Sequence, residues 1–150
     1  MPDVLIADKQ FIFAYALKHS IHSIHPGTSV TLCSPGDDVF QRLKEEKYGV
    51  LILDTLFVDP TVTGPTIAGS ILTEFPGLKI LCVCERAERI STKQYFNKGV
   101  YGYMERDMQE PEFRKAITAI LGGKRYMDPD LLLFLLAIQG PSKPKKLFCI

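Results

Sequence analysis

The sequence predicts an α/β fold in which helices cover both faces of a parallel sheet of five strands. Short apolar runs alternate along the chain with longer segments whose apolar side chains recur at helical spacing. The runs are apolar at successive positions, as expected of strands that are buried on both faces. Turn residues such as Pro-Gly and Gly-Gly separate the segments. This alternation predicts a doubly wound sandwich of three layers with right-handed crossovers.

Five apolar runs are the predicted strands of this sheet. The first and third are Val-Leu-Ile-Ala and Val-Leu-Ile-Leu, and an aspartate follows each of them directly. The fourth is the strongest run, and the fifth is short and begins directly after a glycine. The predicted strands span residues 4–7, 29–33, 50–53, 78–84 and 100–104.

The first two predicted helices are identified by their apolar stripes and by their ends. A Pro-Gly pair at residues 26–27 ends the first helix. Ser34 begins the second as a cap, Pro35 occupies its first turn, and Asp37 is the acid three residues after the cap. The apolar positions of these two helices are Phe13, Ala14, Leu17, Ile21, Ile24, Val39, Phe40 and Leu43.

Three more helices complete the alternation. After a loop over residues 55–63, Gly-Pro opens the third helix at residue 64, and Pro-Gly stops it at residue 76. The fourth helix, residues 88–98, has a poor apolar stripe. Asp107 is expected to cap the fifth, with Glu110 three residues later, and a Gly-Gly pair ends that helix at residue 122.

Composition excludes several classes of protein. Hydrophobic residues make up 46% and charged residues 23% of the 150 residues, which is ordinary for one globular domain with or without a tail. The formal net charge of +1 provides no basic field for binding nucleic acid. The four cysteines form no CxxC motif, which favours reduced thiols and a cytoplasmic location.

No membrane partner and no enzyme activity are expected. The N-terminus lacks the basic region of a secretory signal. The longest apolar run, residues 131–138, is about half as long as a bilayer requires. No glycine-rich phosphate loop, nucleophile elbow or metal triad is visible.

Polar residues follow four of the predicted strands. Asp8 follows the first, Asp54 the third, residues 82–85 lie at the end of the fourth, and Arg106 follows the fifth. The carboxyl ends of parallel strands meet at one edge of a sheet, where ligands of doubly wound folds bind. We therefore expect these residues to converge there.

These motifs resemble the receiver domains of two-component response regulators. The resemblance rests on Asp8, on Asp54 and on the segment Gly-Val-Tyr-Gly-Tyr-Met-Glu-Arg at residues 99–106, and it covers about residues 3–123. The Gly-Tyr pair followed by Arg-Asp looks most like the receivers of LuxR-tailed transcription regulators. The resemblance implies the flavodoxin-like receiver fold with strand order 2-1-3-4-5.

The resemblance also implies the roles of the site residues. Asp54 would be the phosphoacceptor, since an ionised carboxylate is a reasonable nucleophile for phosphoryl transfer. Asp8, Asp54 and the backbone carbonyl of Leu56 would bind Mg²⁺. Arg106 would contact the phosphoryl group, and Tyr103 would be the aromatic residue that switches with phosphorylation.

Three positions depart from the family's usual residues. Lys9 replaces an acid that binds the metal, Arg106 replaces a lysine, and Cys82 stands, on the best alignment, where a switch serine or threonine is usual. Two aspartates against two cations give the site a net charge of zero. Because an ammonium aimed at the metal position repels a cation, we expect weak or absent Mg²⁺ binding and slow phosphorylation.

Two alternatives remain open at this point. Phosphorylation chemistry would be intact if Lys9 turned outward and Glu85 or Asp59 supplied an acid. In the other alternative the chain is a pseudo-receiver, a protein-interaction module that never carries phosphate. An aspartyl-phosphate phosphatase is disfavoured because Leu56 stands where such an enzyme needs a second aspartate.

The C-terminal segment differs from the rest of the chain. We expect a receiver over residues 1–124, then an apolar helix and a basic linker over residues 125–150 that lead to an output domain absent from this chain. The helix is apolar on every face over residues 131–138, so both of its sides should be buried, in a self-association interface or against a missing domain. DNA would be contacted only through the output domain.

The expected partners are a sensor histidine kinase and a second copy of the chain. A homodimer would form through the face of the fourth helix, fifth strand and fifth helix, or through the apolar helix at residues 131–138. Tyr95, Tyr101 and Arg106 are the exposed side chains expected on the first of these faces.

Overall fold

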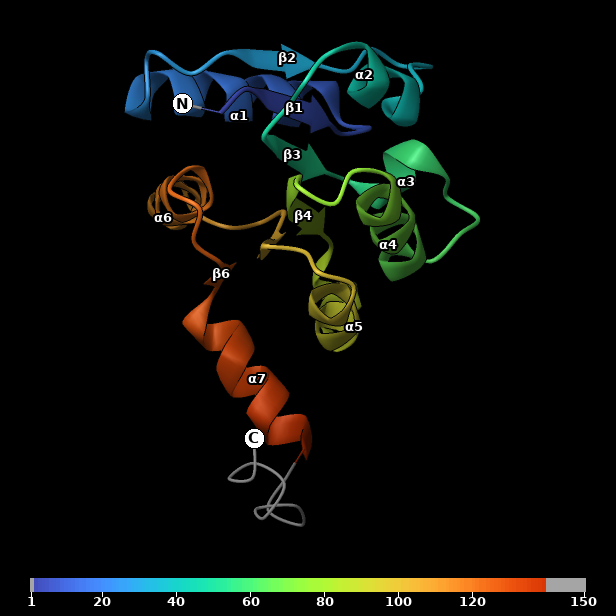
Figure 1. Cartoon of the computed structure of the whole chain (residues 1–150). Coiled ribbons are helices and arrows are strands. Elements are labelled where there is room, and N and C mark those ends of the chain that lie inside the picture. Colours follow the sequence, from blue (N-terminus) through green and yellow to red (C-terminus); the bar gives the residue numbers. More distant parts are fainter. Residues whose placement is uncertain (1, 140–150) are drawn as a thin grey trace.

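A parallel sheet with helices on both faces forms the body of the protein. The computed structural model describes residues 2–139. Within them the sheet has the order β2-β1-β3-β4-β5-β6, and all neighbouring strands are parallel (Figure 1). The strands are β1 (Val4–Ala7), β2 (Val30–Leu32), β3 (Val50–Leu53), β4 (Lys79–Cys84), β5 (Gly102–Glu105) and β6 (Tyr126–Met127). The predicted fold and the order of the first five strands are confirmed, and β6 is an addition to the predicted sheet.

The helices fill two outer layers. They are α1 (Phe11–Ile24), α2 (Val39–Glu45), α3 (Thr55–Val58), α4 (Gly64–Glu74), the 3₁₀ helix η1 (Arg86–Ser91), α5 (Thr92–Asn97), α6 (Glu110–Leu121) and α7 (Pro129–Gln139). Helices α1 and α6 cover one face of the sheet, and α2, α4 and α5 cover the other (Figure 1). Strand residues alternate between two buried apolar clusters because successive side chains point to opposite faces.

Two predicted helix starts are wrong, because α2 and α6 both begin later in the chain than predicted. Asp38, not Ser34, caps α2: its carboxylate accepts a hydrogen bond from the Phe40 N–H at 2.9 Å. Ser34 instead belongs to a turn, in which its N–H donates to Asp37 Oδ2 at 2.7 Å. In the same way α6 begins after Gln109, so the predicted cap at residue 107 lies in the preceding turn.

Two further segments differ from the predicted elements. The predicted loop after β3 begins with the short helix α3, whose first residue follows the capping Asp54. The predicted helix over residues 88–98 is divided into η1 and α5. It begins early because Glu85 and Glu88 form a reciprocal capping box with the backbone.

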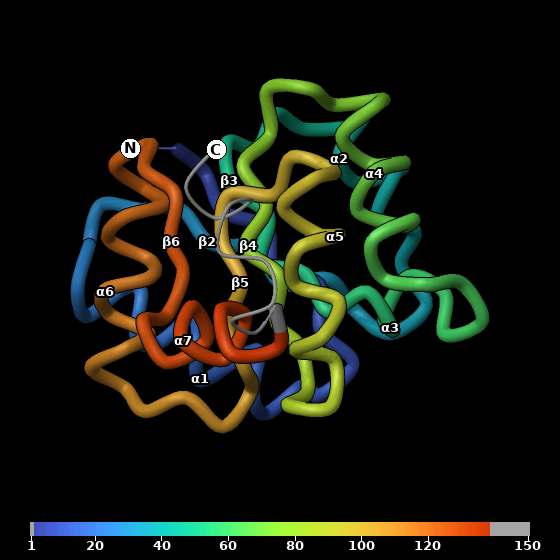
Figure 2. The backbone as a smooth tube through the Cα atoms, turned by 90° about the horizontal axis from the view of Figure 1, so that it is seen from below, coloured from blue at the N-terminus to red at the C-terminus, as the bar shows by residue number. Residues whose placement is uncertain are grey.

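Helix α7 packs on the body of the protein by one side. It lies past the β6 edge of the sheet, between the ends of α6 and α5 (Figures 1 and 2). Leu131 is buried in the cluster on the α5 side, and the Arg89 guanidinium lies 5.3 Å from the centre of the Phe134 ring. Leu132, Leu133 and Leu136 are exposed. Burial of this second side, which was expected against a second copy or a further domain, stays a prediction.

The side chains expected on the face of the fourth helix, fifth strand and fifth helix are not exposed. Tyr95 is completely buried, and Tyr101 is half-buried beneath the Arg125 guanidinium, 4.6 Å from its ring centre. Arg106 is occupied by ion pairs described below.

None of the helices in the described part of the chain is long and apolar enough to cross a membrane. The predicted basic linker lies outside the described residues.

Candidate functional site

Asp8, Asp54 and Arg106 meet at the carboxyl end of the sheet, as predicted. They directly follow β1, β3 and β5. Arg106 Nη1 donates hydrogen bonds to both carboxylate oxygens of Asp8, at 3.0 and 2.9 Å. Arg106 Nη2 lies 3.4 Å from Asp54 Oδ2. One guanidinium therefore bridges the two aspartates, a planar arrangement of donors that a lysine cannot reproduce.

The two aspartates are buried and are held by backbone N–H groups. Their side chains are only 1% and 4% exposed. The Gln10 N–H donates to Asp8 Oδ1 at 2.8 Å. Asp54 Oδ1 accepts from the Leu56 N–H at 3.0 Å, and Asp54 Oδ2 accepts from the Lys9 N–H at 3.4 Å. These donors follow from the sequence, because an aspartate after a strand can cap the turn or helix that comes next.

Arg106 has two more partners outside the aspartate pair. Its Nε donates to Glu85 Oε1 at 3.2 Å, and the centre of its guanidinium lies 4.6 Å from the centre of the Phe13 ring. Burial lowers the pKa of Arg106, but the hydrogen bond and charge of Asp8, together with Asp54 and Glu85, leave the pKa above its usual value. Burial also raises the pKa of Asp8, against the Gln10 N–H and Arg106. The guanidinium thus stays charged in contact with three carboxyl groups.

The charge of the site differs from the sequence prediction. Three carboxylates and one guanidinium form the ion pairs, which gives a net charge of −2 rather than zero. The Lys9 side chain is exposed, and its ammonium belongs to none of the ion pairs among residues 2–139. Only the backbone of Lys9 contacts Asp54. Arg106, not Lys9, is therefore the cation that lies between the aspartates. Lys9 turns outward and Glu85 supplies an acid, which are the two conditions named above for intact phosphorylation chemistry.

The two cysteines of β4 lie on the side of the sheet that faces α5. Cys82 is in register with Leu53 and with Tyr103, inside the strand, while Cys84 is the last residue of β4. Burial raises the pKa of both thiols well above the usual value, so they are unreactive at neutral pH. Cys84, not Cys82, is thus the residue at the end of β4.

The predicted switch residue Tyr103 is completely buried and packs on a second tyrosine. Its ring centre lies 5.7 Å from that of Tyr95. The Tyr103 hydroxyl has no hydrogen-bond partner within the described part of the chain. A Cβ at Gly64 would overlap with the Tyr95 hydroxyl, so this position requires glycine. The interior beside β4 and β5 is consequently filled by two aromatic rings.

The sequence did not single out Phe13, and it offered Glu85 only as an alternative acid. Phe13 belongs to the predicted apolar stripe of α1, which gave no sign that its ring would contact a cation. Glu85 is the first residue after β4, so its position at the carboxyl edge was the available signal. Asp59, the other alternative acid, binds its own loop instead, through Thr61.

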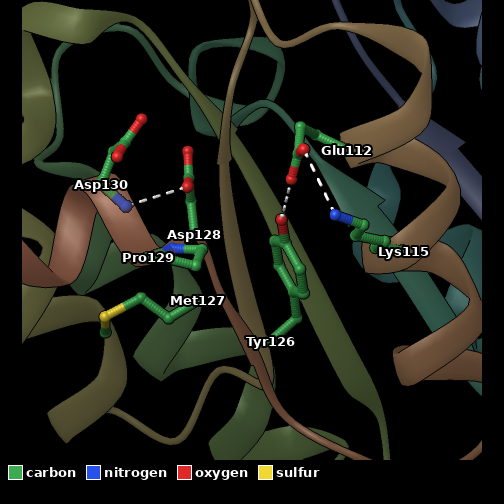
Figure 3. Close-up of a pocket in the computed structure, with 7 residues that line it drawn as sticks. All are labelled: Glu112, Lys115, Tyr126, Met127, Asp128, Pro129 and Asp130. Atoms are coloured by element: carbon green, nitrogen blue, oxygen red, sulfur yellow. Dashed lines mark hydrogen bonds and ion pairs between the residues drawn. The ribbon is translucent and has the colours of Figure 1, made fainter.

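A small cavity of about 200 Å³ lies beside Asp8. Its walls come from the ends of β1 and β2 and from α3, and they are Asp8, Lys9, Phe11, Cys33, Pro35, Gly36, Leu56 and Phe57. A larger cavity of about 410 Å³ between α6, β6 and the start of α7 contains none of the site residues (Figure 3). There the Tyr126 hydroxyl donates to Glu112 Oε2 at 3.3 Å. Asp8 and Leu56 line the smaller cavity, but Asp54 itself does not.

Comparison with known proteins identifies the family. Residues 4–118 match the family model of the response regulator receiver domain. The chain belongs to this family. Among curated proteins it is similar to the transcriptional activator protein ExaE of Pseudomonas putida, with 23% identity over 140 residues. That match covers 93% of this chain, and the chain spans 64% of the length of the relative.

Solved structures agree with the fold. A two-component response regulator of the LuxR family from Aurantimonas sp. SI85-9A1 is 20% identical, with a TM-score of 0.77 over 93% of this chain and 98% of that chain. RcsB from Salmonella enterica serovar Typhimurium, bound to promoter rprA in the presence of phosphomimetic BeF₃⁻, is 21% identical, with a TM-score of 0.79 over 93% and 70% of the two chains. At these identities the likeness concerns the fold.

The chain is thus a receiver domain of the two-component type. Receiver domains are regulatory modules rather than classical enzymes, they interact with histidine kinases, and they generally bind Mg²⁺ at the phosphorylation site. The donor set described here does not fit that ion, because Arg106 holds both aspartates. Among residues 2–139 no group of three or more His, Cys, Asp or Glu side chains is arranged to hold a metal.

Proposed function

We propose that this receiver belongs to a transcription regulator and that Asp54 is its phosphoacceptor. The observation that carries the proposal is the position of Asp54: its buried carboxylate lies at the carboxyl end of β3, between two backbone N–H groups and the Arg106 guanidinium. The cavity lined by Asp8 and Leu56 is the space that we propose for the phosphoryl oxygens. A buried carboxylate with a fixed direction and a cation beside it suits phosphoryl transfer, which depends mainly on positioning and on charge neutralisation.

In the proposed reaction one carboxylate oxygen of Asp54 attacks the phosphorus of the donor. A bond between that oxygen and phosphorus forms while the bond from phosphorus to the leaving group breaks, and the leaving group keeps the electron pair. Arg106 Nη2 is the nearest side-chain donor to Asp54 and would neutralise the phosphoryl oxygens. We assign the switch position to Cys84 rather than Cys82, because Cys84 ends β4, and we keep Tyr103 as the switch aromatic.

Further proposals concern the metal, the domains and the location. Mg²⁺, with Asp8, Asp54 and the Leu56 carbonyl as its ligands, would bind weakly or not at all. We divide the chain into a receiver over residues 1–124 and a C-terminal part over residues 125–150. An output domain beyond this part would contact DNA. The described cysteines are free and buried, which supports a reducing cytoplasm as the place of action.

A histidine kinase would dock at the start of α1. Phe11, Ile12 and Tyr15 are exposed there by 57%, 84% and 61%, and Phe11 also lines the cavity beside Asp8. An apolar patch next to the reactive carboxylate suits a partner that must bring its phosphohistidine to Asp54. Ile12→Glu should slow transfer from a phosphorylated kinase and leave transfer from a small phosphodonor unchanged.

A second copy of the chain would pack on α7. Three leucines of this helix, at positions 132, 133 and 136, are exposed together on its outer side. No charged side chain interrupts residues 131–138, so two such helices could bury the same apolar surface against each other in a twofold dimer.

The phosphoacceptor proposal is tested with a small phosphodonor and mass spectrometry of the intact protein. We expect a slowly formed adduct with the mass of one phosphoryl group, and peptide mapping should place it on Asp54. Asp54→Asn should abolish the adduct, while Asp59→Asn, which changes an aspartate outside the site, should leave it unchanged. An adduct that persists in Asp54→Asn, or no adduct from either a small donor or a kinase, would contradict the proposal.

A further inference from the structure

We propose that Arg106 is a built-in counter-ion that takes the place of a divalent metal ion at this site, so that the receiver works without Mg²⁺. This inference concerns the same site as the proposed function, and only its last step rests on Asp54 being the phosphoacceptor. Three carboxyl groups surround the guanidinium, those of Asp8, Asp54 and Glu85. Carboxylate oxygens are the ligands that hard cations take, and here they face a cation that is part of the chain.

The carboxylate oxygens of the two aspartates already have donors. Asp8 Oδ1 accepts from the Gln10 N–H and from Arg106 Nη1, and Asp8 Oδ2 accepts from Arg106 Nη1. Asp54 Oδ1 accepts from the Leu56 N–H, and Asp54 Oδ2 faces the Lys9 N–H and Arg106 Nη2. A metal ion would have to displace the guanidinium from both aspartates at once, in a pocket where the freed positive charge would repel the ion.

Two positioning residues hold the guanidinium over the aspartates. Glu85 binds Nε, the corner of the guanidinium that faces neither aspartate, and the Phe13 ring lies 4.6 Å from the guanidinium centre. Together they restrain a flexible side chain, of which only 11% is exposed. Glu85 is itself half-exposed, so its part is to orient Arg106 rather than to bury further charge.

The contact distances suggest how the site could accept a phosphoryl group without releasing Arg106. The two hydrogen bonds to Asp8 have ordinary lengths of 3.0 and 2.9 Å, whereas the contact from Nη2 to Asp54 is the longest that Arg106 makes to a carboxyl group, at 3.4 Å. Arg106 can therefore stay anchored on Asp8 while Nη2 turns from the Asp54 carboxylate to an oxygen of a phosphoryl group on it. A bidentate guanidinium is well suited to both anions.

Mg²⁺ titration followed by thermal unfolding tests the inference without any phosphorylation. The wild-type chain should show no shift of its midpoint with millimolar Mg²⁺, because a ligand stabilises only a state that it binds. Arg106→Gln removes the counter-ion, keeps a planar polar group, and leaves three carboxyl groups free. We expect this variant to bind Mg²⁺ about 100-fold more tightly than the wild-type chain, and its midpoint should rise with Mg²⁺.

Several variants separate positioning from general effects. Arg114→Gln is the matched control, because Arg114 makes an exposed ion pair with Glu110 on α6. It should behave as the wild-type chain does. Glu85→Gln and Phe13→Leu should raise Mg²⁺ affinity less than Arg106→Gln does. Phe13→Tyr keeps an aromatic ring at this position, so its Mg²⁺ affinity should be that of the wild-type chain.

Magnesium dependence of the wild-type chain decides the inference even if Arg106→Gln does not fold. A clear Mg²⁺-dependent shift in the wild-type chain would overturn it, as would an Arg106→Gln variant that folds and gains no affinity. If Asp54 accepts phosphate, the adduct should form equally fast with Mg²⁺ and with a chelator. The absence of any adduct would refute the phosphoacceptor proposal alone, because the titration does not depend on phosphorylation.

Discussion

Arg106→Gln should destabilise the protein more than any other single change to the site, because it leaves two buried carboxyl groups without their cation. Arg106 lies 2.9 Å from Asp8 and 3.4 Å from Asp54. At an effective dielectric of about 20, these contacts correspond to gross attractions of about 6 and about 5 kcal/mol. Desolvation of the three groups offsets most of this sum. Breaking a buried pair from one side typically costs about 3–5 kcal/mol, and we expect a loss in this range.

Glu85→Gln provides the internal comparison for this prediction. Glu85 binds the same guanidinium at 3.2 Å, but its side chain is 51% exposed. Solvent screening should therefore hold the loss below about 1 kcal/mol. Urea unfolding of both variants in a chelating buffer, followed by far-ultraviolet circular dichroism, measures the two free energies.

A double-mutant cycle with Asp8→Asn makes the prediction sharper. If the guanidinium and the Asp8 carboxyl group stabilise each other, the losses of the two single variants should not add. The double variant should be about 2 kcal/mol more stable than the sum predicts. Additive losses, or an Arg106→Gln variant no less stable than Glu85→Gln, would refute the reasoning that Arg106 is the central cation of the site.

Three other features of the structure can be tested separately. Gly64→Ala should lower the free energy of unfolding by about 1–3 kcal/mol in urea, because its Cβ would overlap with the Tyr95 hydroxyl. In a Tyr95→Phe background the same substitution should cost less, and equal losses in the two backgrounds would contradict this. Leu136→Glu should convert a dimer to a monomer in light scattering, whereas Ile138→Glu, near the end of α7, should weaken the dimer less. A wild-type chain that is monomeric at high concentration would refute the α7 dimer. Burial, with the nearby Glu112 charge, raises the pKa of Tyr126 to about 12, so its contribution to stability is present below about pH 10 and is lost between about pH 10 and 12. Tyr126→Phe should therefore flatten the alkaline loss of stability over that window, and an unchanged profile would contradict the prediction.

Most of the fold could be predicted because it depends on patterns that extend over many residues. Buried parallel strands require continuous apolar runs, and five such runs alternate with amphipathic segments. The elements that were not predicted are short: β6 has two residues and α3 has four. Neither is long enough to carry a periodicity of its own. β6 exists because Tyr126 and Met127 pass beside β5, in register with Gly102 and Tyr103.

The start of α2 was missed for a different reason, which is competition between two good caps. Ser34 with Pro35 is a common start of a helix, and Asp38 is another. In the structure Ser34 belongs to a turn, in which its N–H donates to Asp37. Asp38 is the residue that caps the helix, since its carboxylate accepts from the Phe40 N–H. Local sequence cannot rank two caps that lie four residues apart, since packing of Val39 and Leu43 against the sheet decides where the helix begins.

At the site, the sequence predicted which residues converge but not which cation lies between the acids. The sequence points to Lys9 because it stands where the family usually has an acid that binds the metal. Yet the side chains of two consecutive residues after a strand point in different directions. Here the Lys9 side chain turns to solvent, while its backbone N–H faces Asp54. Arg106 comes from another strand, 98 residues away from Asp8, and reaches both aspartates because β5 ends at the same edge as β1 and β3.

Two of the departures from the family's usual residues, Lys9 and Arg106, therefore do not act independently. With its metal-binding acid replaced by Lys9, the site has lost a ligand, and the guanidinium at position 106 supplies charge where a metal would otherwise lie. A lysine there would place a single point charge that could not hold both oxygens of Asp8, approach Asp54 and bind Glu85 in one plane. Arg106→Lys should consequently keep the net charge but loosen the site, so its Mg²⁺ affinity should fall between those of the wild-type chain and Arg106→Gln. A lysine variant that excludes Mg²⁺ as completely as the wild-type chain would show that charge alone, and not the shape of the guanidinium, closes this site.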